Sequence, residues 1–148
     1  MISIVIPALN EEKYIGALLE SIGAQVFSEE IEIIVADAGS TDGTREAILR
    51  YARTHPRVTI VPGGLPAIAR NNGAKASSGD PIFFIDADVI IPDTDFLETA
   101  VRFFRGGKFA VATVLLRPDS DYLLDHAMVA INNIWLPLSK YIRPSGAM

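Results

Sequence analysis

Cysteine is absent from all 148 positions of the sequence. Its absence excludes disulfide bonds, thiolate metal sites and cysteine nucleophiles, and it is typical of proteins that work in a reducing compartment. The opening MISIVIPALNEE also has an apolar run too short, and followed too closely by acids, for a signal peptide. We therefore expect a cytoplasmic protein.

Runs of basic residues are absent as well. Thirteen lysines and arginines stand against eighteen aspartates and glutamates, which gives a formal net charge of −5. No stretch could follow a phosphate backbone, so we expect no nucleic-acid partner. Hydrophobic residues make up 49% of the chain and charged residues 21%, which excludes a disordered chain and predicts one domain, residues 1–148, around a single core.

Several nucleotide-binding and catalytic signatures are missing. The sequence has no G-x-x-x-x-G-K-[ST] and no G-x-G-x-x-G after its first apolar run, so a P-loop and a dinucleotide-binding Rossmann site are disfavoured. His55 and His126 are isolated, and no Ser/His/Asp or histidine-rich metal pattern appears. A lone histidine is more often structural than catalytic.

Short β-branched runs alternate with helical patterns along the chain. Because the predicted strands are apolar on both faces, we predict an α/β fold with a mostly parallel sheet and helices on both of its faces. Asn10 is the expected N-cap of the first helix, and Ser40 and Thr41 are candidate N-caps of the second. The predicted strands are 2–6, 31–36, 58–61, 82–85 and 109–116, and the predicted helices are 11–25, 42–55, 66–78 and 95–105.

Three polar segments directly follow three of the predicted strands. They are PALNEE (7–12), DAGSTDGT (37–44) and DAD (86–88). Ligands of parallel α/β sheets bind outside the carboxyl ends of the strands. The three segments are therefore expected to converge on one site.

The DAD segment interrupts IFFIDADVIIP, residues 82–92, which otherwise has the pattern of a fully buried strand. Bare carboxylates are costly to bury, so they must pair, protonate or hold a cation. In an extended chain Asp86 and Asp88 point to the same side, and Ala87 is small enough to let a ligand approach. Oxygen ligands of this kind suit Mg²⁺ or Mn²⁺, with a diphosphate and water completing the shell. The alternative is that the two acids end a strand and cap a turn.

The remaining polar residues each allow a structural and a functional interpretation. The backbone N–H groups of DAGSTDGT could bind an anion where the second helix begins, or its side chains could only cap that helix. The helix macrodipole alone would explain Glu11 and Glu12. Arg70 and Asn71 lie on a helix of small residues, where they either contact phosphate or nucleotide or belong to a solvated face.

In combination, these motifs resemble the nucleotide-sugar-binding part of a family 2 glycosyltransferase of GT-A fold. SIVIPALNEEKYIGALLESI resembles the opening of that family, IEIIVADAGSTDGT its second strand and turn, and ARNNGAKASSGDPIFFIDADVIIP its third helix and metal motif. The motifs cover most of residues 3–92. The resemblance implies a GT-A type fold, a nucleoside diphosphate sugar as donor, and Mg²⁺ or Mn²⁺ as cofactor.

The resemblance also implies roles for individual residues. Val35 and Asp37 would lie against the base, and Asp88 would be the chief metal ligand. The family's usual second acid after Asp37 is replaced by Ala38 in this sequence, so a base contact from that position is not expected. The residues implied for nucleotide binding are Pro7, Ala8, Leu9, Glu11, Val35, Asp37, Arg70, Asn71, Asp86 and Ala87, and those implied for the metal are Asp86 and Asp88.

The implied reaction is the inverting transfer of a sugar from a UDP- or GDP-sugar to a hydroxyl acceptor, a glycan or a lipid. It needs a general base, which family members carry in a segment after the DAD strand. Asp119, Asp121 and Asp125 are the acids there, but none matches that segment, so no base is assigned and the acceptor side is expected to be incomplete. One alternative is a non-catalytic donor-binding module that needs a partner or a missing half. Another is a sugar-phosphate nucleotidyltransferase, which would carry a glycine-rich basic loop where PALNEE is acidic.

The segment YLLDHAMVAINNIWLPLSKYI, residues 122–142, is long enough to span a membrane. It contains Asp125, Lys140 and a central Pro137, so it lacks the pattern of a transmembrane helix. We expect an amphipathic helix that packs on the core or on a partner segment. The alternatives are self-association and peripheral contact with the cytoplasmic face of a membrane.

Overall fold

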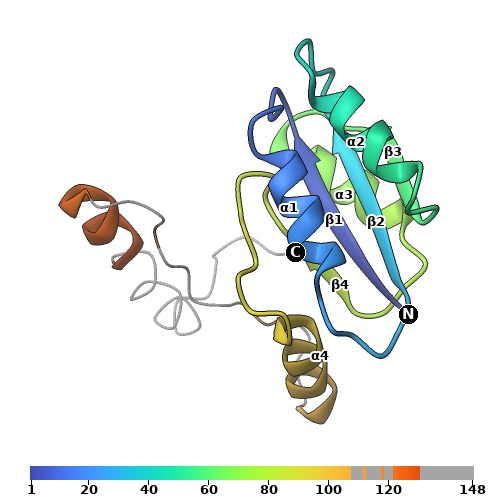
Figure 1. Cartoon of the computed structure of the whole chain (residues 1–148), viewed down its shortest axis with the longest axis vertical. Coiled ribbons are helices and arrows are strands. Elements are labelled where there is room, and N and C mark those ends of the chain that lie inside the picture. Colours follow the sequence, from blue (N-terminus) through green and yellow to red (C-terminus); the bar gives the residue numbers. More distant parts are fainter. Residues whose placement is uncertain (108–111, 113–117, 119–121, 131–148) are drawn as a thin grey trace, which may run out of the picture. The chain divides into compact units, whose positions relative to one another are not determined.

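The computed structural model describes residues 1–107, 112, 118 and 122–130. The chain divides into two compact units, Met1–Lys108 and Phe109–Met148. The first unit contains all the labelled helices and strands of Figure 1. In chain order they are β1 (Ile2–Ala8), α1 (Ile15–Gly23), β2 (Ile31–Asp37), α2 (Thr44–Ala52), β3 (Val58–Pro62), α3 (Pro66–Ala76), β4 (Ile82–Phe84) and α4 (Phe96–Gly106).

The four strands form one parallel sheet in the order β3-β2-β1-β4. β1 pairs with β2 along its whole length, from Ile2 opposite Ile31 to Ala8 opposite Asp37, and with β4 on its other side. Because all the strands run the same way, their carboxyl ends lie at one edge of the sheet. Four of the predicted strands are thereby confirmed, while the fifth, 109–116, falls almost wholly outside the described residues.

Helices cover both faces of this sheet, α1 and α2 on one face and α3 on the other (Figure 1). On the first face, Ile4 and Ile6 of β1 are fully buried in one core cluster with Leu18 of α1. On the other face, α3 approaches β1 so closely that a Cβ on Gly73 would stand 2.2 Å from Cγ1 of Val5. The small residues of α3 allow this close packing. The predicted α/β architecture, with helices on both faces of a parallel sheet, is confirmed.

Two helices begin later than the sequence predicts. α1 starts at Ile15 and α2 at Thr44, and neither uses a predicted N-cap. Asn10, Ser40 and Thr41 instead use their polar groups to join the β1–α1 loop to the β2–α2 loop. The predicted caps are therefore wrong, because hydrogen bonds between distant segments replace the local ones that capping patterns assume.

The opposite, amino-terminal edge of the sheet carries a charged cluster around Glu29. Its carboxylate accepts a hydrogen bond from the N-terminal ammonium of Met1 at 2.6 Å and others from Arg105 of α4. Arg105 also donates to the carbonyl of Asp80 at 2.8 Å. Hydrogen bonds from Arg105, and then from the ammonium, lower the pKa of Glu29 to about 2.

This cluster makes the stability of the protein depend on pH in the acid range. Because the folded pKa of Glu29 is depressed, its contribution is present above the ordinary pKa of 4.5 and is lost as the pH falls through about 2. In Glu29→Gln, we expect the thermal unfolding midpoint to change less between about pH 5 and about pH 2 than it does in the parent. Unfolding curves measured across that range test this, and parallel slopes in the two proteins would contradict it.

In the second unit, the structure describes one helix, over residues 123–130. Leu123, Leu124 and Met128 are exposed on it. The predicted helix is thus present over the first part of 122–142, and residues 131–142 lie outside the described part of the chain. None of the helices described is long and apolar enough to cross a membrane.

Candidate functional site

A cavity of about 440 Å³ lies at the carboxyl-terminal edge of the sheet, at the ends of β1 and β4. Segments far apart in the sequence form it: the PALNEE stretch at the end of β1, the DAD segment after β4, and the start of α3. Eight of the eleven predicted site residues line it. The lining residues are Pro7, Ala8, Leu9, Glu11, Ala38, Gly64, Pro66, Ala69, Arg70, Asp86, Ala87 and Asp88.

The DAD segment forms a turn rather than part of a buried strand. β4 ends at Phe84, and the N–H of Val89 donates to the carbonyl of Asp86 at 3.2 Å. The Asp86 side chain is 59% exposed, and Asp88 is exposed as well, whereas Ala87 is buried. The strand therefore ends within one residue of its predicted end at 85, and the DAD segment follows it as predicted, but its two carboxylates are exposed rather than buried. The chain leaves the sheet before Asp86, so both carboxylates stay solvated and avoid the cost of burial.

Arg70 of α3 is the basic residue of the cavity. Its Nη2 lies 2.5 Å from Oδ1 of Asp86, so an ion pair joins α3 to the DAD segment. Both side chains remain partly exposed, and a pair of this kind contributes little to stability. Its effect is local: it places one guanidinium, a good phosphate ligand, in an otherwise acidic cavity.

Glu11 is the third acid that lines the cavity, with Asp86 and Asp88. Burial is the largest cause that raises its pKa, and the negative charges of Asp88, Asp42 and Asp86 raise it further. The carboxylates of the cavity therefore repel one another. A bound cation would relieve this repulsion.

Hydrogen bonds join two loops beside the cavity, residues 10–12 after β1 and residues 40–44 after β2. We call this network the loop clasp. Three consecutive amides of the first loop donate into the second: Asn10 to Ser40 Oγ at 3.0 Å, Glu11 to Thr44 Oγ1 at 2.7 Å, and Glu12 to Asp42 Oδ2 at 3.2 Å. Two amides donate in return: Thr41 to Asn10 Oδ1 at 2.9 Å, and Gly43 to Glu12 Oε2 at 2.7 Å.

Four of the amides that precede and begin α2 already donate to side chains. The N–H of Ser40 donates to Asp37 Oδ1 and that of Thr44 to Asp42 Oδ1, each at 3.0 Å, while the amides of residues 41 and 43 belong to the clasp. The side chains of Asp37, Asn10, Glu12 and Asp42 accept these four hydrogen bonds. Anion binding by DAGSTDGT stays a prediction that would have to use the other amides of this segment.

Asp37 lies at the end of β2, outside the cavity lining. Its side chain is fully shielded from solvent, and it accepts hydrogen bonds from Ser40 Oγ at 2.6 Å and Arg45 Nη1 at 2.8 Å. Burial alone would raise the pKa of Asp37, but the hydrogen bonds from Ser40 and Arg45 outweigh it and lower the pKa. Val35, which is fully buried, and Asn71, which is exposed, are also not among the lining residues. Contacts of these three residues with a nucleotide stay predictions.

Four lining residues escape the sequence-based prediction: Ala38, Gly64, Pro66 and Ala69. Small and apolar side chains carry no chemical signature. They reach the cavity because the turn between β3 and α3 brings PGGLP beside the end of β2, where the N–H of Gly63 donates to the Asp37 carbonyl at 2.7 Å. Only the pairing of the strands identifies them.

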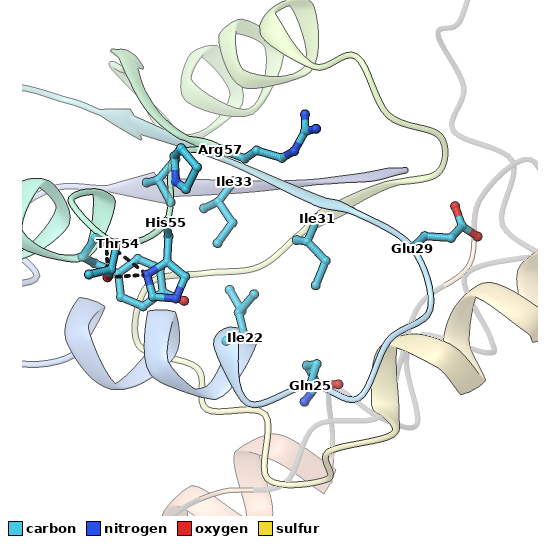
Figure 2. Close-up of a pocket in the computed structure, with 12 residues that line it drawn as sticks. Ile22, Gln25, Glu29, Ile31, Ile33, Thr54, His55 and Arg57 are labelled. Atoms are coloured by element: carbon cyan, nitrogen blue, oxygen red, sulfur yellow. Dashed lines mark hydrogen bonds between the residues drawn. The ribbon is translucent and has the colours of Figure 1, made fainter.

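A second cavity, of about 330 Å³, lies near the opposite edge of the sheet (Figure 2). Ile22, Ile31 and Ile33 give it an apolar lining. His55 stacks on Tyr51 with ring centroids 3.8 Å apart, and its Nδ1 lies 3.0 Å from the Tyr51 carbonyl. This cavity contains none of the predicted site residues, so we place the candidate site at the carboxyl-terminal edge.

The chain is similar to known proteins in sequence and in structure. The sequence profile of glycosyl transferase family 2 matches residues 3–144. The chain belongs to glycosyl transferase family 2. The glucosyl-3-phosphoglycerate synthase of Mycobacterium tuberculosis is 42% identical over 103 residues, which are 65% of this chain and 31% of that protein. The chain thus spans about a third of the length of the glucosyl-3-phosphoglycerate synthases it matches.

Solved structures of related transferases resemble this family 2 chain. The mannosyltransferase PcManGT from Pyrobaculum calidifontis, in complex with GDP-Man and Mn²⁺, matches 86% of this chain and 37% of its own, at 30% identity and a TM-score of 0.65. The M. tuberculosis synthase, in complex with Mn²⁺, UDP and glucosyl-3-phosphoglycerate, matches 73% of this chain and 40% of its own, at 33% identity and a TM-score of 0.59. These neighbours are GT-A glycosyltransferases, and the predicted fold class is confirmed.

The oxygen atoms that line the cavity at the carboxyl ends of the strands suit a divalent cation. Asp86 and Asp88 supply the carboxylate oxygens that Mg²⁺ and Mn²⁺ prefer, and Arg70 engages one oxygen of Asp86. Within the part of the chain that the structure describes, no group of three or more acidic, histidine or cysteine residues could hold a metal. The protein can thus offer two carboxylates, which is usual for ions that complete their shell with water and phosphate oxygens.

Proposed function

We propose that the chain forms the donor-binding part of a metal-dependent glycosyltransferase that moves a sugar from a nucleoside diphosphate sugar to a hydroxyl group of a glycan or a lipid, with inversion at the anomeric carbon. One observation carries the proposal: the cavity brings the acids of DAD, Glu11 and Arg70 together at the carboxyl ends of the strands. The complexes of family members with GDP-Man and with UDP support a UDP- or GDP-linked donor.

Different residues of the chain bind different parts of the donor. Pro7, Ala8 and Leu9 offer an apolar wall for the nucleoside, and Ala87 allows its ribose to approach closely. Arg70 binds a phosphate oxygen and limits the negative charge that a diphosphate would otherwise meet. Val35 and Asp37, along the adjacent strand, support the base end of the pocket.

Asp86 and Asp88 are the residues that would hold Mg²⁺ or Mn²⁺. When bound, the ion supplies Lewis-acid stabilisation of the charge that develops on the departing diphosphate. Asp86 orients Arg70 through their ion pair, while Asp88, which makes no such pair among the described residues, offers its whole carboxylate. The Mn²⁺ found in complexes of two family members supports this assignment.

Inversion at the anomeric carbon requires the acceptor hydroxyl to attack directly and lose its proton to a base. No residue of this chain is assigned that role. Asp119 and Asp121 lie outside the described residues, and Asp125 lies in the second unit. Direct attack also means that no sugar becomes attached to the protein during transfer.

Transfer is tested by incubating the protein with UDP- and GDP-sugars, Mn²⁺ and a mixed panel of glycan and lipid acceptors. We expect release of nucleoside diphosphate, a product whose anomeric configuration by NMR is opposite to that of the donor, and loss of the reaction on chelation of the metal. A product with the donor's configuration, or turnover unaffected by chelation, would contradict the proposed mechanism.

The alternative is a donor-binding module without transfer activity. Such a module binds the nucleotide together with metal and shows neither transfer nor hydrolysis of any donor on the panel. Detectable turnover would eliminate it.

Asp37→Ala should weaken nucleotide binding with and without metal. Its carboxylate holds Ser40 and Arg45, so its loss loosens the end of β2 beside the cavity. We expect about a tenfold loss of affinity by calorimetry, the effect of roughly one lost hydrogen bond to a charged group. Glu30→Gln, which breaks an exposed pair with Arg57, is the control and should bind like the parent. Unchanged affinity in a folded Asp37→Ala protein would refute the expected contribution to the base pocket.

A further inference from the structure

The loop clasp has one fully buried side chain on its α2 side, that of Thr44, the first residue of the helix. Its hydroxyl oxygen accepts the N–H of Glu11 at 2.7 Å and donates its own proton to Oδ1 of Asp42. A single hydroxyl thus serves as acceptor for one loop and donor to the other. No other side chain accepts a hydrogen bond from the amide of a cavity-lining acid in the described residues.

Asp42 is held in place on both of its oxygens. Oδ1 accepts the N–H of Thr44 at 3.0 Å as well as the hydroxyl, and Oδ2 accepts the N–H of Glu12 at 3.2 Å. The orientation of the Thr44 hydroxyl is therefore fixed by a carboxylate that is itself fixed. This arrangement fixes the direction of the Glu11 N–H, and with it the position from which the Glu11 side chain extends.

We propose that Thr44 is a positioning residue of the donor site, whose hydroxyl fixes the backbone of Glu11 and with it the cavity wall formed by residues 7–11. The proposal rests on the proposed function, since it assigns Thr44 to nucleotide binding. Thr44 itself does not line the cavity, so it acts only through Glu11 and its neighbours.

The negative charge of the cavity explains why the backbone of Glu11 needs to be held in place. Glu11 shares the cavity with Asp86 and Asp88, and like charges push a carboxylate away from such a cluster. Without the hydrogen bond to its N–H, Glu11 would turn toward solvent more easily. Because Thr44 is the first residue of α2, its hydrogen bond to the Glu11 amide ties Glu11 to a helix. This contact keeps the cavity in one shape before a ligand binds.

The opposite edge of the same sheet offers a matched control. Ser3 is also fully buried, and its hydroxyl also joins two distant segments, accepting the N–H of Gly79 at 2.8 Å and donating to Glu32. Removing either hydroxyl breaks two partly buried hydrogen bonds. Only Thr44, however, is connected to the candidate site.

The test compares Thr44→Val, Thr44→Ser and Ser3→Ala by two measurements: hydrogen exchange of the amides of residues 10–12, and the affinity for UDP and GDP with Mn²⁺. We expect Thr44→Val to lose exchange protection at Glu11 and about tenfold in nucleotide affinity, as for the loss of one well-placed hydrogen bond. Thr44→Ser should restore both, because it keeps the hydroxyl. Ser3→Ala should lower the unfolding midpoint while it binds nucleotide like the parent.

Equal nucleotide affinity in Thr44→Val and Ser3→Ala would overturn the positioning role, and so would a serine variant as weak as the valine one. If the parent protein binds neither nucleotide, the proposed function fails, and exchange alone decides the role of Thr44. Loss of protection confined to residues 10–12 in Thr44→Val then supports positioning of the loop, and unchanged protection at Glu11 overturns it.

Discussion

Replacing Asp88 by asparagine removes the Mn²⁺-dependent part of nucleotide binding and leaves the fold intact. The amide keeps the size of the side chain but loses the charge that attracts a divalent cation. We expect the affinity for UDP or GDP in the presence of Mn²⁺ to fall by about 100-fold or more, beyond what loss of an outer-shell group causes. Because Asp88 is exposed, the thermal unfolding midpoint should not change. Calorimetry and thermal unfolding measure the two effects.

The control for this variant is Asp93→Asn, an exposed acid a few residues further along the same segment but outside the cavity lining. It removes the same charge at nearly the same place in the sequence. We expect it to bind metal and nucleotide like the parent. Equal losses in the two variants would show a general effect of charge, and normal binding by Asp88→Asn would show that Asp88 is not a metal ligand.

Gly63→Ala should destabilise the folded protein strongly. A Cβ at this position would stand 2.6 Å from the backbone N of Ala38 and 2.7 Å from the carbonyl oxygen of Ala36. These are backbone atoms of β2 and its end, so no side chain can move to relieve the overlap. We expect the free energy of unfolding in urea to fall by about 3 kcal/mol, the upper end for overpacking. Nucleotide affinity should fall too, since Ala38 lines the cavity.

Gly16→Ala is the matched control for the effect of adding a methyl group. Gly16 lies in α1, and a Cβ there would meet nothing within 4 Å. Alanine in a helix is more favourable than glycine by about 0.5–1 kcal/mol, so this variant should be slightly more stable than the parent. A Gly63→Ala protein as stable as Gly16→Ala would contradict the close approach of the β3–α3 turn to β2.

The sequence predicts the strands and the edge of the sheet at which the site lies. β-branched runs such as those of β1 and β2 have few alternatives to a buried parallel strand, and the carboxyl ends of such strands must share an edge. The sequence alone therefore places PALNEE and DAD together. Their order in the sheet, with β1 between β2 and β4, then brings Glu11 and Asp86 to one cavity.

The local geometry of the site cannot be predicted in the same way. The apolar residues on both sides of DAD in the run 82–92 suggest that its carboxylates are buried at the end of a strand, although Asp86 lies in an exposed turn. Asn10 and Thr44 are of residue types that commonly cap helices, but the side chain of each accepts a hydrogen bond from an amide more than thirty residues away in sequence. Hydrogen bonds between distant loops leave no periodic pattern, and only the folded structure shows them.

The central claim is that the cavity at the carboxyl ends of β1 and β4 binds a nucleoside diphosphate together with a divalent cation. Calorimetric titration of the 148-residue chain with UDP and with GDP, each with and without Mn²⁺, tests it most directly. We predict saturable binding of at least one nucleotide that requires Mn²⁺ and is lost in Asp88→Asn. A folded protein that binds neither nucleotide in the presence of Mn²⁺ would contradict it.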